Sequence, residues 1–454
     1  MPYNKDISFS MREYLKKAVI LILTWEARVI LKKYKPKIVA VTGSVGKTST
    51  KDAIAKVLER KFSVRKSEKS YNSELGVPLT IIGAESGWNS IQKWFEVIWR
   101  SLNVILWRGA YPEILVLEVG ADRPGDIKKI RQLITPDVAV LTALAETPVH
   151  VEFFDGSEQV FEEKSELVKN LRREAHVVLN FDDDRIMSMS AEGGSASGGK
   201  MLEKTSAKIL TYGMSEGSDF GARDYEIFYR KDNKKTIPEG IEFKARYGKN
   251  ELPVKIINTF GAHHIYPALA AIAVGSVFGI KFEDAVEALS LYSPPPGRLK
   301  LIEGLKDTLI LDDTYNSSPK ALRAALDVLN EIDAKRKITI LGDMLELGKH
   351  TITAHRDLGR AAAVVADILV TVGVRAKFFM EGAIKEGFKK KTIYTFGSSE
   401  EAAKELGKLI QPGDLILVKG SQSIRMEKIV EALMAHPEKK EELLCRQDEA
   451  WQNR

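Results

Sequence analysis

The chain has 454 residues, of which 44% are hydrophobic and 29% charged, a balance typical of globular proteins with substantial cores. Lys and Arg number 68 against 62 Asp and Glu, and the net charge of +6 is spread without the long basic block that binds nucleic acid. Cys445 is the only cysteine, which excludes a disulfide framework or a cysteine-based metal site within one chain and fits a reducing cytoplasm.

The first 36 residues predict one amphipathic helix that ends in a lysine-rich run at residues 32–37. The longest apolar stretch, residues 18–23, is far shorter than the ~20 residues that span a bilayer, and no signal-peptide cleavage site follows it. We therefore expect a cytoplasmic protein whose N-terminal helix packs on the next domain. A helix lying on a membrane surface is the alternative.

Residues 37–295 predict a central domain in which strands and helices alternate. Apolar, β-branched runs at residues 38–42, 114–119 and 138–144 are each followed by polar or helical sequence, and a helix is expected over residues 48–60. This order is typical of a mostly parallel α/β sheet. Alternating residues at 225–259 predict antiparallel hairpins.

Four of the six tryptophans lie between residues 88 and 107, in a segment that predicts an amphipathic helix. Its apolar residues fall on one stripe, which is more often directed toward a core than toward a partner or a membrane. We expect a core-facing stripe, with a weak membrane or partner contact through residues 89–107 and the N-terminal helix as the alternative. The stripe consists of Ile91, Trp94, Phe95, Ile98, Trp99, Leu102, Ile105 and Leu106.

Three consecutive prolines at residues 294–296 are followed by Gly297, and they place a domain boundary here because helix cannot form through them. Beyond the boundary, residues 296–454 alternate again. Strands are expected near residues 308–312, 337–341, 367–371, 392–395 and 414–418. The second domain is therefore predicted to be smaller, Rossmann-like and doubly wound.

The strongest chemical signal is the sequence TGSVGKT at residues 42–48, between a strand and a helix. Glycines let backbone N–H groups curl around phosphate, Lys47 can reach the terminal phosphates, and the Thr48 hydroxyl can bind Mg²⁺. The loop is a compact variant, because Thr42 rather than Gly stands four residues before Gly46. The predicted nucleotide-binding residues are Gly43, Ser44, Val45, Gly46, Lys47, Thr48 and Ser49.

Three further residues of the central domain come next to predicted strands or helices. Glu118 ends an apolar strand, so its carboxylate is expected at the carboxyl edge of the sheet, where it could bind a metal. His150 follows the next strand by a short loop and can reach the same edge. Lys164 lies in a helix rich in glutamate, which by spacing alone indicates a solvated charged face.

The second domain offers carboxylates at a strand end and one arginine at the hinge. Asp312 and Asp313 close a predicted strand, where they suit contacts to a ribose or a metal; capping of the following helix is the alternative. Arg298 follows the proline run and could swing onto a γ-phosphate as two domains close, or be a linker charge.

Together these residues resemble the Mur ligase family, most closely the branch that adds D-alanyl-D-alanine to the peptidoglycan precursor. The resemblance spans residues 37–436. It rests on TGSVGKT (42–48), YNSELGVPLT (71–80), LEVGA (117–121), PGDI (124–127), His150 with FDGS (154–157), GRL (297–299), DDTYN (312–316), LGDM (341–344) with ELG (346–348), and VKGS (418–421).

The resemblance implies a P-loop-type central ATPase domain and residue roles within it. Lys47 would hold the β- and γ-phosphates, and two Mg²⁺ ions would be bound, one by Thr48 and Glu118 and one by His150 and a carbamylated Lys164. The second domain would contribute Arg298 and Asp313 to the γ-phosphate and the ribose, with Tyr315 and Asn316 in the same cleft. Asn72 and Ser73 would contact substrate.

The implied reaction converts a substrate carboxylate to an acyl phosphate and joins it to an amine. The expected substrates are a muramyl-peptide precursor and D-Ala-D-Ala, the expected cofactors are ATP and Mg²⁺, and a monomer that binds no nucleic acid is expected.

Two features of the sequence depart from the family pattern. Only a helix precedes residue 42, where the family carries a UDP-binding domain, and His264 and Pro267 stand at its adenine-side Asn positions.

Two other functions remain open from the sequence. A ligase resembling folylpolyglutamate synthase, or another two-domain ligase that adds amino acids, would also lack the UDP-binding domain. A nucleotide-binding scaffold without catalysis, recruited through the tryptophan-rich segment, belongs to a different class. Relatives with a zinc-binding cysteine cluster are excluded by the lone Cys445.

Overall fold

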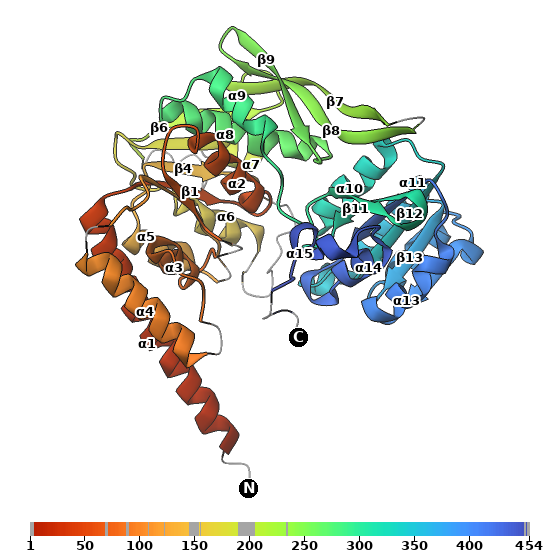
Figure 1. Cartoon of the computed structure of the whole chain (residues 1–454), viewed down its shortest axis with the longest axis horizontal. Helices are drawn as coiled ribbons and strands as arrows, with labels where there is room; N and C mark the ends of the chain where they lie inside the picture. Colours follow the sequence, from red (N-terminus) through yellow and green to blue (C-terminus); the bar gives the residue numbers. More distant parts are fainter. Residues whose placement is uncertain are drawn as a thin grey trace.

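The computed structural model describes residues 4–68, 71–87, 90–107, 109–121, 123–144, 154, 156–188, 205–232, 235–448 and 451. Within these ranges the chain forms two sheets, each covered by helices on both faces (Figure 1). The predicted α/β fold is confirmed, with a larger, mostly parallel sheet followed by a smaller one.

The first sheet is parallel from β2 to β7 and ends in the antiparallel strands β8 and β9, as the hairpin pattern predicted. The described strands lie in the spatial order β2 (Val64–Lys66), β3 (Ile114–Glu118), β1 (Lys37–Thr42), β4 (Val138–Leu141), β5 (His176–Asn180), β6 (Lys208–Gly213), β7 (Phe220–Asp232), β8 (Lys235–Tyr247) and β9 (Asn250–Ile257).

Both faces of this sheet are buried, which explains why its parallel strands are almost continuously apolar. In β1, Val39 and Val41 face one hydrophobic core while Ile38 and Ala40 face the other. The first core packs under α2 (Lys47–Leu58), α8 (Ile265–Val277) and α9 (Phe282–Ser290). The second packs under α1 (Asn4–Tyr34), α3 (Gly76–Ile82), α4 (Ile91–Leu106), α5 (Asp126–Leu133), α6 (Ser157–Ser165) and α7 (Asp184–Met187).

The second sheet begins after α9, so the sequence boundary near residue 295 falls between α9 and β10. Its order is β10 (Lys300–Gly304), β11 (Thr308–Asp313), β15 (Asp414–Lys419), β12 (Arg336–Gly342), β13 (Ile368–Val372) and β14 (Ile393–Phe396), with only β10 antiparallel to its neighbour. One face is covered by α10 (Pro319–Glu331), α11 (Thr351–Val365) and α12 (Lys377–Lys385), the other by α13 (Ser399–Leu409), α14 (Glu427–Leu433) and α15 (Lys440–Leu443).

The predicted N-terminal helix is confirmed, and it packs on the first sheet through Leu23, Ala27 and Ile30. Figure 1 shows α1 and α4 side by side, with the N-terminal end of α1 projecting beyond the body. No helix in the described ranges is both long enough and apolar enough to cross a bilayer.

The stripe of α4 does not face the core as a whole, and the core-facing interpretation is wrong for three of its eight residues. Over residues 92–106 of α4, the buried residues are Val97 and Ser101, which lie to one side of the stripe. Only its near edge, with Trp94 and Ile105, packs partly on the core. Because successive residues turn a helix by about 100°, the far edge points to solvent. Its exposed members are Phe95, Trp99 and Leu106.

Candidate active site

The phosphate loop leaves β1 and enters α2 at Lys47. Gly43 has φ 150°, and a Cβ there would lie 2.0 Å from Oγ1 of Thr142, so only glycine fits. The Thr142 hydroxyl donates to the Val45 carbonyl over 2.6 Å and fixes the loop against the end of β4. Gly46, with φ 85°, caps α2 without a side chain, which leaves the first-turn amides directed at an anion site.

Lys47 and Thr48 begin α2 beside the buried carboxylate of Glu118. Lys47 donates from Nζ to the Gly43 carbonyl over 2.9 Å, so its side chain folds back over the loop. Thr48 donates from Oγ1 to Oε2 of Glu118 over 3.0 Å. Asn72 donates from its amide to Oε1 of Glu118 over 3.1 Å. Thr48, predicted to bind Mg²⁺, and Asn72, predicted to contact substrate, thus meet around the carboxylate of Glu118 at the edge of the sheet.

Glu118 is almost fully buried, and among the described residues the side chains that donate to its carboxylate oxygens, those of Thr48 and Asn72, are neutral. A buried carboxylate is costly without a compensating charge. The hydroxyl of Thr48 and the carboxylate of Glu118 are hard oxygen donors, the kind that Mg²⁺ accepts alongside substrate phosphates. The donor set therefore fits Mg²⁺. Among the described residues, no three His, Cys, Asp or Glu side chains gather into a metal-binding cluster.

Lys164 is buried on α6 and lines the same cavity as Lys47 and Glu118, so the solvated face suggested by its spacing is not observed. The neighbouring Glu163 anchors this helix: its carboxylate accepts from the amides of Gly125 and Ile127, both over 2.7 Å. His150, the other predicted ligand of the second metal, lies outside the described residues.

The second sheet contributes Arg298, whose guanidinium stacks on Tyr315 with Cζ 4.2 Å from the ring centroid. Gly297 makes this possible, because its φ is 74° and a Cβ would lie 2.9 Å from the Tyr315 amide nitrogen. Among the described residues, buried Nε of Arg298 has no hydrogen-bond partner. Arg298 is therefore held at the cavity by stacking, with a donor still available.

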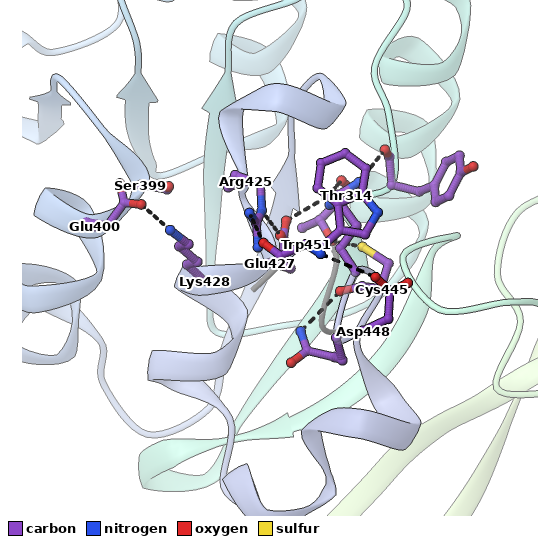
Figure 2. Close-up of polar contacts among 12 residues, drawn as sticks. Thr314, Ser399, Glu400, Arg425, Glu427, Lys428, Cys445, Asp448 and Trp451 are labelled. Carbon is purple, nitrogen blue, oxygen red and sulfur yellow. Dashed lines mark hydrogen bonds and ion pairs between the residues drawn. The ribbon is translucent and has the colours of Figure 1, made fainter. Parts of the chain in front are cut away.

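A C-terminal segment supports the loop that carries Tyr315 and Asn316 (Figure 2). Arg446 donates to the carbonyls of Thr314 and Tyr315 over 2.6 and 2.8 Å and pairs with Glu427 over 2.6 Å. Trp451 lies near Arg425, whose Nη1 donates to its carbonyl over 2.9 Å. The segment thereby fixes loop residues that line the cavity.

These elements enclose a cavity of about 1470 Å³ that is lined from both sheets. The predicted residues that line it are Ser44, Val45, Gly46, Lys47, Thr48, Ser49, Asn72, Glu118, Lys164, Arg298, Tyr315 and Asn316.

Comparison with protein-family models identifies the family. The model of the Mur ligase middle domain matches residues 41–275, and that of the Mur ligase glutamate ligase domain matches residues 297–422. The chain belongs to the Mur ligase family.

Named relatives and solved structures of this family cover most of the chain. The UDP-N-acetylmuramoyl-tripeptide–D-alanyl-D-alanine ligase of Bacillus subtilis is 29% identical over 416 residues, which span 90% of this chain and 79% of the relative. The enzyme of that name in Escherichia coli is 27% identical over 400 residues, or 87% and 76% of the two chains.

The structure of a MurF ligase from Thermotoga maritima in complex with ADP superposes with a TM-score of 0.72 at 27% identity, covering 91% of this chain and 83% of that one. Folylpolyglutamate synthase of Mycobacterium tuberculosis, complexed with ADP, has a TM-score of 0.64 at 13% identity and covers 90% and 94% of the two chains. That likeness shows the shared fold.

Four predicted site residues within the described ranges of this Mur ligase do not line the cavity. Gly43 and Ser73 are each next in sequence to a lining residue but do not line the cavity themselves. Asp313 instead forms an ion pair with Lys419 on β15. His264 is buried against His263, with ring centroids 4.4 Å apart, and neither ring nitrogen has a partner among the described residues. Burial lowers the pKa of His264, and the nearby charge of Arg298 acts in the same direction.

Sequence reasoning missed much of the cavity wall. Asp182 accepts hydrogen bonds from the Tyr266 hydroxyl over 2.9 Å and from the amides of Met214 and Ser215. Its carboxylate is therefore held in place in the wall of the cavity. Other missed lining residues come from both sheets. They include Asp183, Asp184 and Arg185 after β5, and from the second domain Lys320, Arg323, Glu346, His350, Asp357, Ser421, Gln422, Arg425 and Trp451. Among them, Glu346 and Ser421 lie in motifs quoted from the sequence, although neither was predicted as a site residue.

Proposed function

We propose that this Mur ligase is an ATP-dependent amide ligase of peptidoglycan precursor synthesis, which activates a carboxylate of a muramyl-peptide precursor and joins it to the amine of D-Ala-D-Ala. The observation that carries the proposal is the shared cavity. The phosphate loop, Glu118 and Lys164 line it from the first sheet, and Arg298 with Asn316 lines it from the second. A two-sided site of this kind can hold a nucleotide and an acceptor together.

The substrate assignment is supported by the names of the relatives, which include the Bacillus subtilis and Escherichia coli D-alanyl-D-alanine ligases. The use of ATP is supported by the ADP complexes of the Thermotoga maritima and Mycobacterium tuberculosis neighbours. Sequence identity favours the cell-wall ligase over folylpolyglutamate synthase, because this chain is 27% identical to the MurF ligase and 13% identical to the synthase.

The loop amides of residues 44–46 and the Lys47 ammonium would bind the β- and γ-phosphates of ATP. Thr48 and Glu118 would hold one Mg²⁺, and His150 with a carbamylated Lys164 a second. Bound there, the ions would neutralise phosphate charge and polarise the transferring group. Carbamylation starts from the Lys164 ammonium, which first loses one proton. The neutral Nζ then bonds to the carbon of CO₂ and loses a second proton, so that a buried cation is replaced by a carboxylate.

The reaction would proceed in two steps. A carboxylate oxygen of the precursor attacks the γ-phosphorus, forming an oxygen–phosphorus bond as the bond to the β-phosphate oxygen breaks and ADP leaves. The amine of D-Ala-D-Ala then attacks the acyl carbon, phosphate leaves, and the amine loses a proton. Lys47 and Arg298 would stabilise the anionic charge that gathers on the transferring phosphoryl group. Asn72 would orient Glu118 and lie near the substrate, with Ser73 beside it.

The test is ADP release and product mass with purified protein, UDP-MurNAc-tripeptide and D-Ala-D-Ala. We expect turnover that needs both substrates and a product joined by one new amide bond. Lys47→Ala should lower kcat by about 10²-fold or more. Lys249→Ala, an exposed lysine in the β8–β9 turn, is the matched control and should leave it unchanged. Turnover with a folate and glutamate instead would refute the assignment.

A further inference from the structure

The outer face of α1 carries large apolar side chains that the fold leaves uncovered. Leu21 is 71% exposed and Trp25 57%, and Ile22 next to them is also exposed. They lie on the side opposite Leu23, Ala27 and Ile30, which pack on the first sheet. Leu21, Ile22 and Trp25 follow the three- and four-residue spacing that places side chains on one helical face.

The adjacent helix α4 has an uncovered apolar face of the same kind. Phe95, Trp99 and Leu106 recur at helical spacing on the edge of the stripe that turns away from the core, and Trp99 is 68% exposed. Trp107, directly after the helix, is 63% exposed. Contiguous apolar faces of this size on a folded protein mark interaction sites more often than chance exposure.

Contacts between the two helices place these faces at the same level. Glu26 of α1 is buried next to Ser101 of α4, whose side chain opposes the rise in the pKa of Glu26 that burial causes. One to two turns further along, Lys33 of α1 donates to the carbonyls of Val104 and Trp107, over 3.0 and 2.8 Å. The helices therefore run parallel and lie side by side, as their ribbons in Figure 1 show. The exposed apolar residues thus belong to two neighbouring helices, and together they are called the α1/α4 surface.

This surface, defined by Leu21, Ile22, Trp25, Phe95, Trp99, Leu106 and Trp107, lies among basic side chains. Over residues 18–34, where the side chains of α1 are described, the helix has three basic residues, Arg28, Lys32 and Lys33, and one acid, the buried Glu26. Arg28 and Lys32 continue the exposed face of α1 toward its C-terminal end. Lys93 and Arg100 are exposed on α4, with Glu96 the one acid of that helix.

We propose that the α1/α4 surface docks on the face of a membrane that contains anionic phospholipids. Tryptophan and leucine insert at the level between headgroups and acyl chains, and each surrounding Lys or Arg gains from the negative surface potential. A second copy of the chain is a poorer occupant, because two such faces brought together would oppose one basic rim to another. The surface would hold the active-site cavity next to a bilayer, independently of the reaction proposed above.

The proposal is tested by flotation of the full chain with two kinds of vesicle, phosphatidylcholine alone and phosphatidylcholine mixed with phosphatidylglycerol. We expect binding to the mixed vesicles that weakens as salt is raised, and little binding to the neutral ones. Trp99→Ser and Trp25→Ser should each weaken binding by about tenfold or more. Both residues are exposed in the free protein, so ADP release should be unchanged.

Val364→Ser is the matched control, since Val364 is equally exposed on the far domain and lies outside this surface. It should bind vesicles like the parent chain. Failure to bind mixed vesicles at all would overturn the proposal, as would binding that Trp99→Ser and Trp25→Ser leave intact. A dimer in solution that Trp99→Ser converts to a monomer would also overturn it, in favour of a second copy as occupant.

Discussion

Lys419 donates from Nζ to Oδ2 of Asp313 over 2.6 Å, and both side chains are buried. The two residues stand opposite each other in the register of β11 and β15. Lys419 also donates to the Asn316 carbonyl over 2.8 Å. Burial lowers the pKa of Lys419, while the charge of Asp313 opposes that shift. The pair therefore ties two strand ends to the loop that carries Tyr315 and Asn316.

Lys419→Met should destabilise the chain by about 3–5 kcal/mol, because it leaves the carboxylate of Asp313 buried and uncompensated. Adding Asp313→Leu to that variant should recover most of the loss, since both charges are then removed. Urea unfolding measures the free energies. Lys408→Met, which breaks an exposed pair with Glu405, is the control and should change stability by less than about 1 kcal/mol.

A further variant, Asp313→Asn, distinguishes a role of Asp313 in positioning the loop from direct binding of ATP. If Asp313 positions the loop, Asp313→Asn lowers stability together with activity. If Asp313 instead contacts the ribose, Asp313→Asn raises the KM for ATP and leaves the unfolding free energy unchanged. A raised KM with unchanged stability would contradict the role of the buried Asp313–Lys419 pair in positioning the loop.

The phosphate loop could be predicted because its chemistry is local: Gly43, Gly46 and Lys47 lie within five consecutive residues between a strand and a helix. The partner of Asp313 could not, because Lys419 is brought opposite it only by the strand order of the second sheet. The α4 stripe shows a different limit. Periodicity identifies the apolar face of a helix, but which part the fold covers depends on contacts such as Ser101 with Glu26.

Gly43→Ala should weaken ADP binding by about tenfold or more. The new Cβ would meet Oγ1 of Thr142 at 2.0 Å in a backbone conformation that side chains rarely adopt, so the loop must shift away from the phosphates. A titration with ADP measures the dissociation constant. Gly109→Ala, where a Cβ meets nothing within 4 Å, is the control. Unchanged ADP binding by Gly43→Ala would show that this loop geometry is not needed.

Lys164→Ala should lose about 10²-fold or more in kcat, because the proposed carbamate oxygens can no longer help to hold a metal ion. Bicarbonate or a short-chain acid such as acetate should restore part of the rate by supplying oxygens in the space left empty. The same additives should not rescue Lys47→Ala. Lys169→Ala, which removes a nearby lysine paired with Glu166, should keep full activity. Absence of rescue at any acid concentration would contradict carbamylation.

Asp312→Asn should abolish part of the pH dependence of stability. Asp312 is fully buried, and burial raises its pKa to about 6, with hydrogen bonds from Thr314 acting in the opposite direction. Between pH ~4 and ~6 the unfolded chain loses this proton while the folded chain keeps it, so stability falls as pH rises. By pH ~7 the free energy of unfolding has fallen by roughly 3 kcal/mol on account of Asp312. Asparagine does not titrate, so the Asp312→Asn chain does not lose this stability.

The comparison must be made as a difference between variant and parent, because buried His264 acts in the opposite sense. Its lowered pKa leaves the folded chain neutral where the unfolded chain binds a proton, so its contribution to stability grows as pH rises. His264 is present in both chains and its effect cancels. Urea unfolding from pH ~4 to ~7 should show the Asp312→Asn chain gaining stability relative to the parent throughout that range. Parallel pH profiles would mean that Asp312 is ionised in the folded chain.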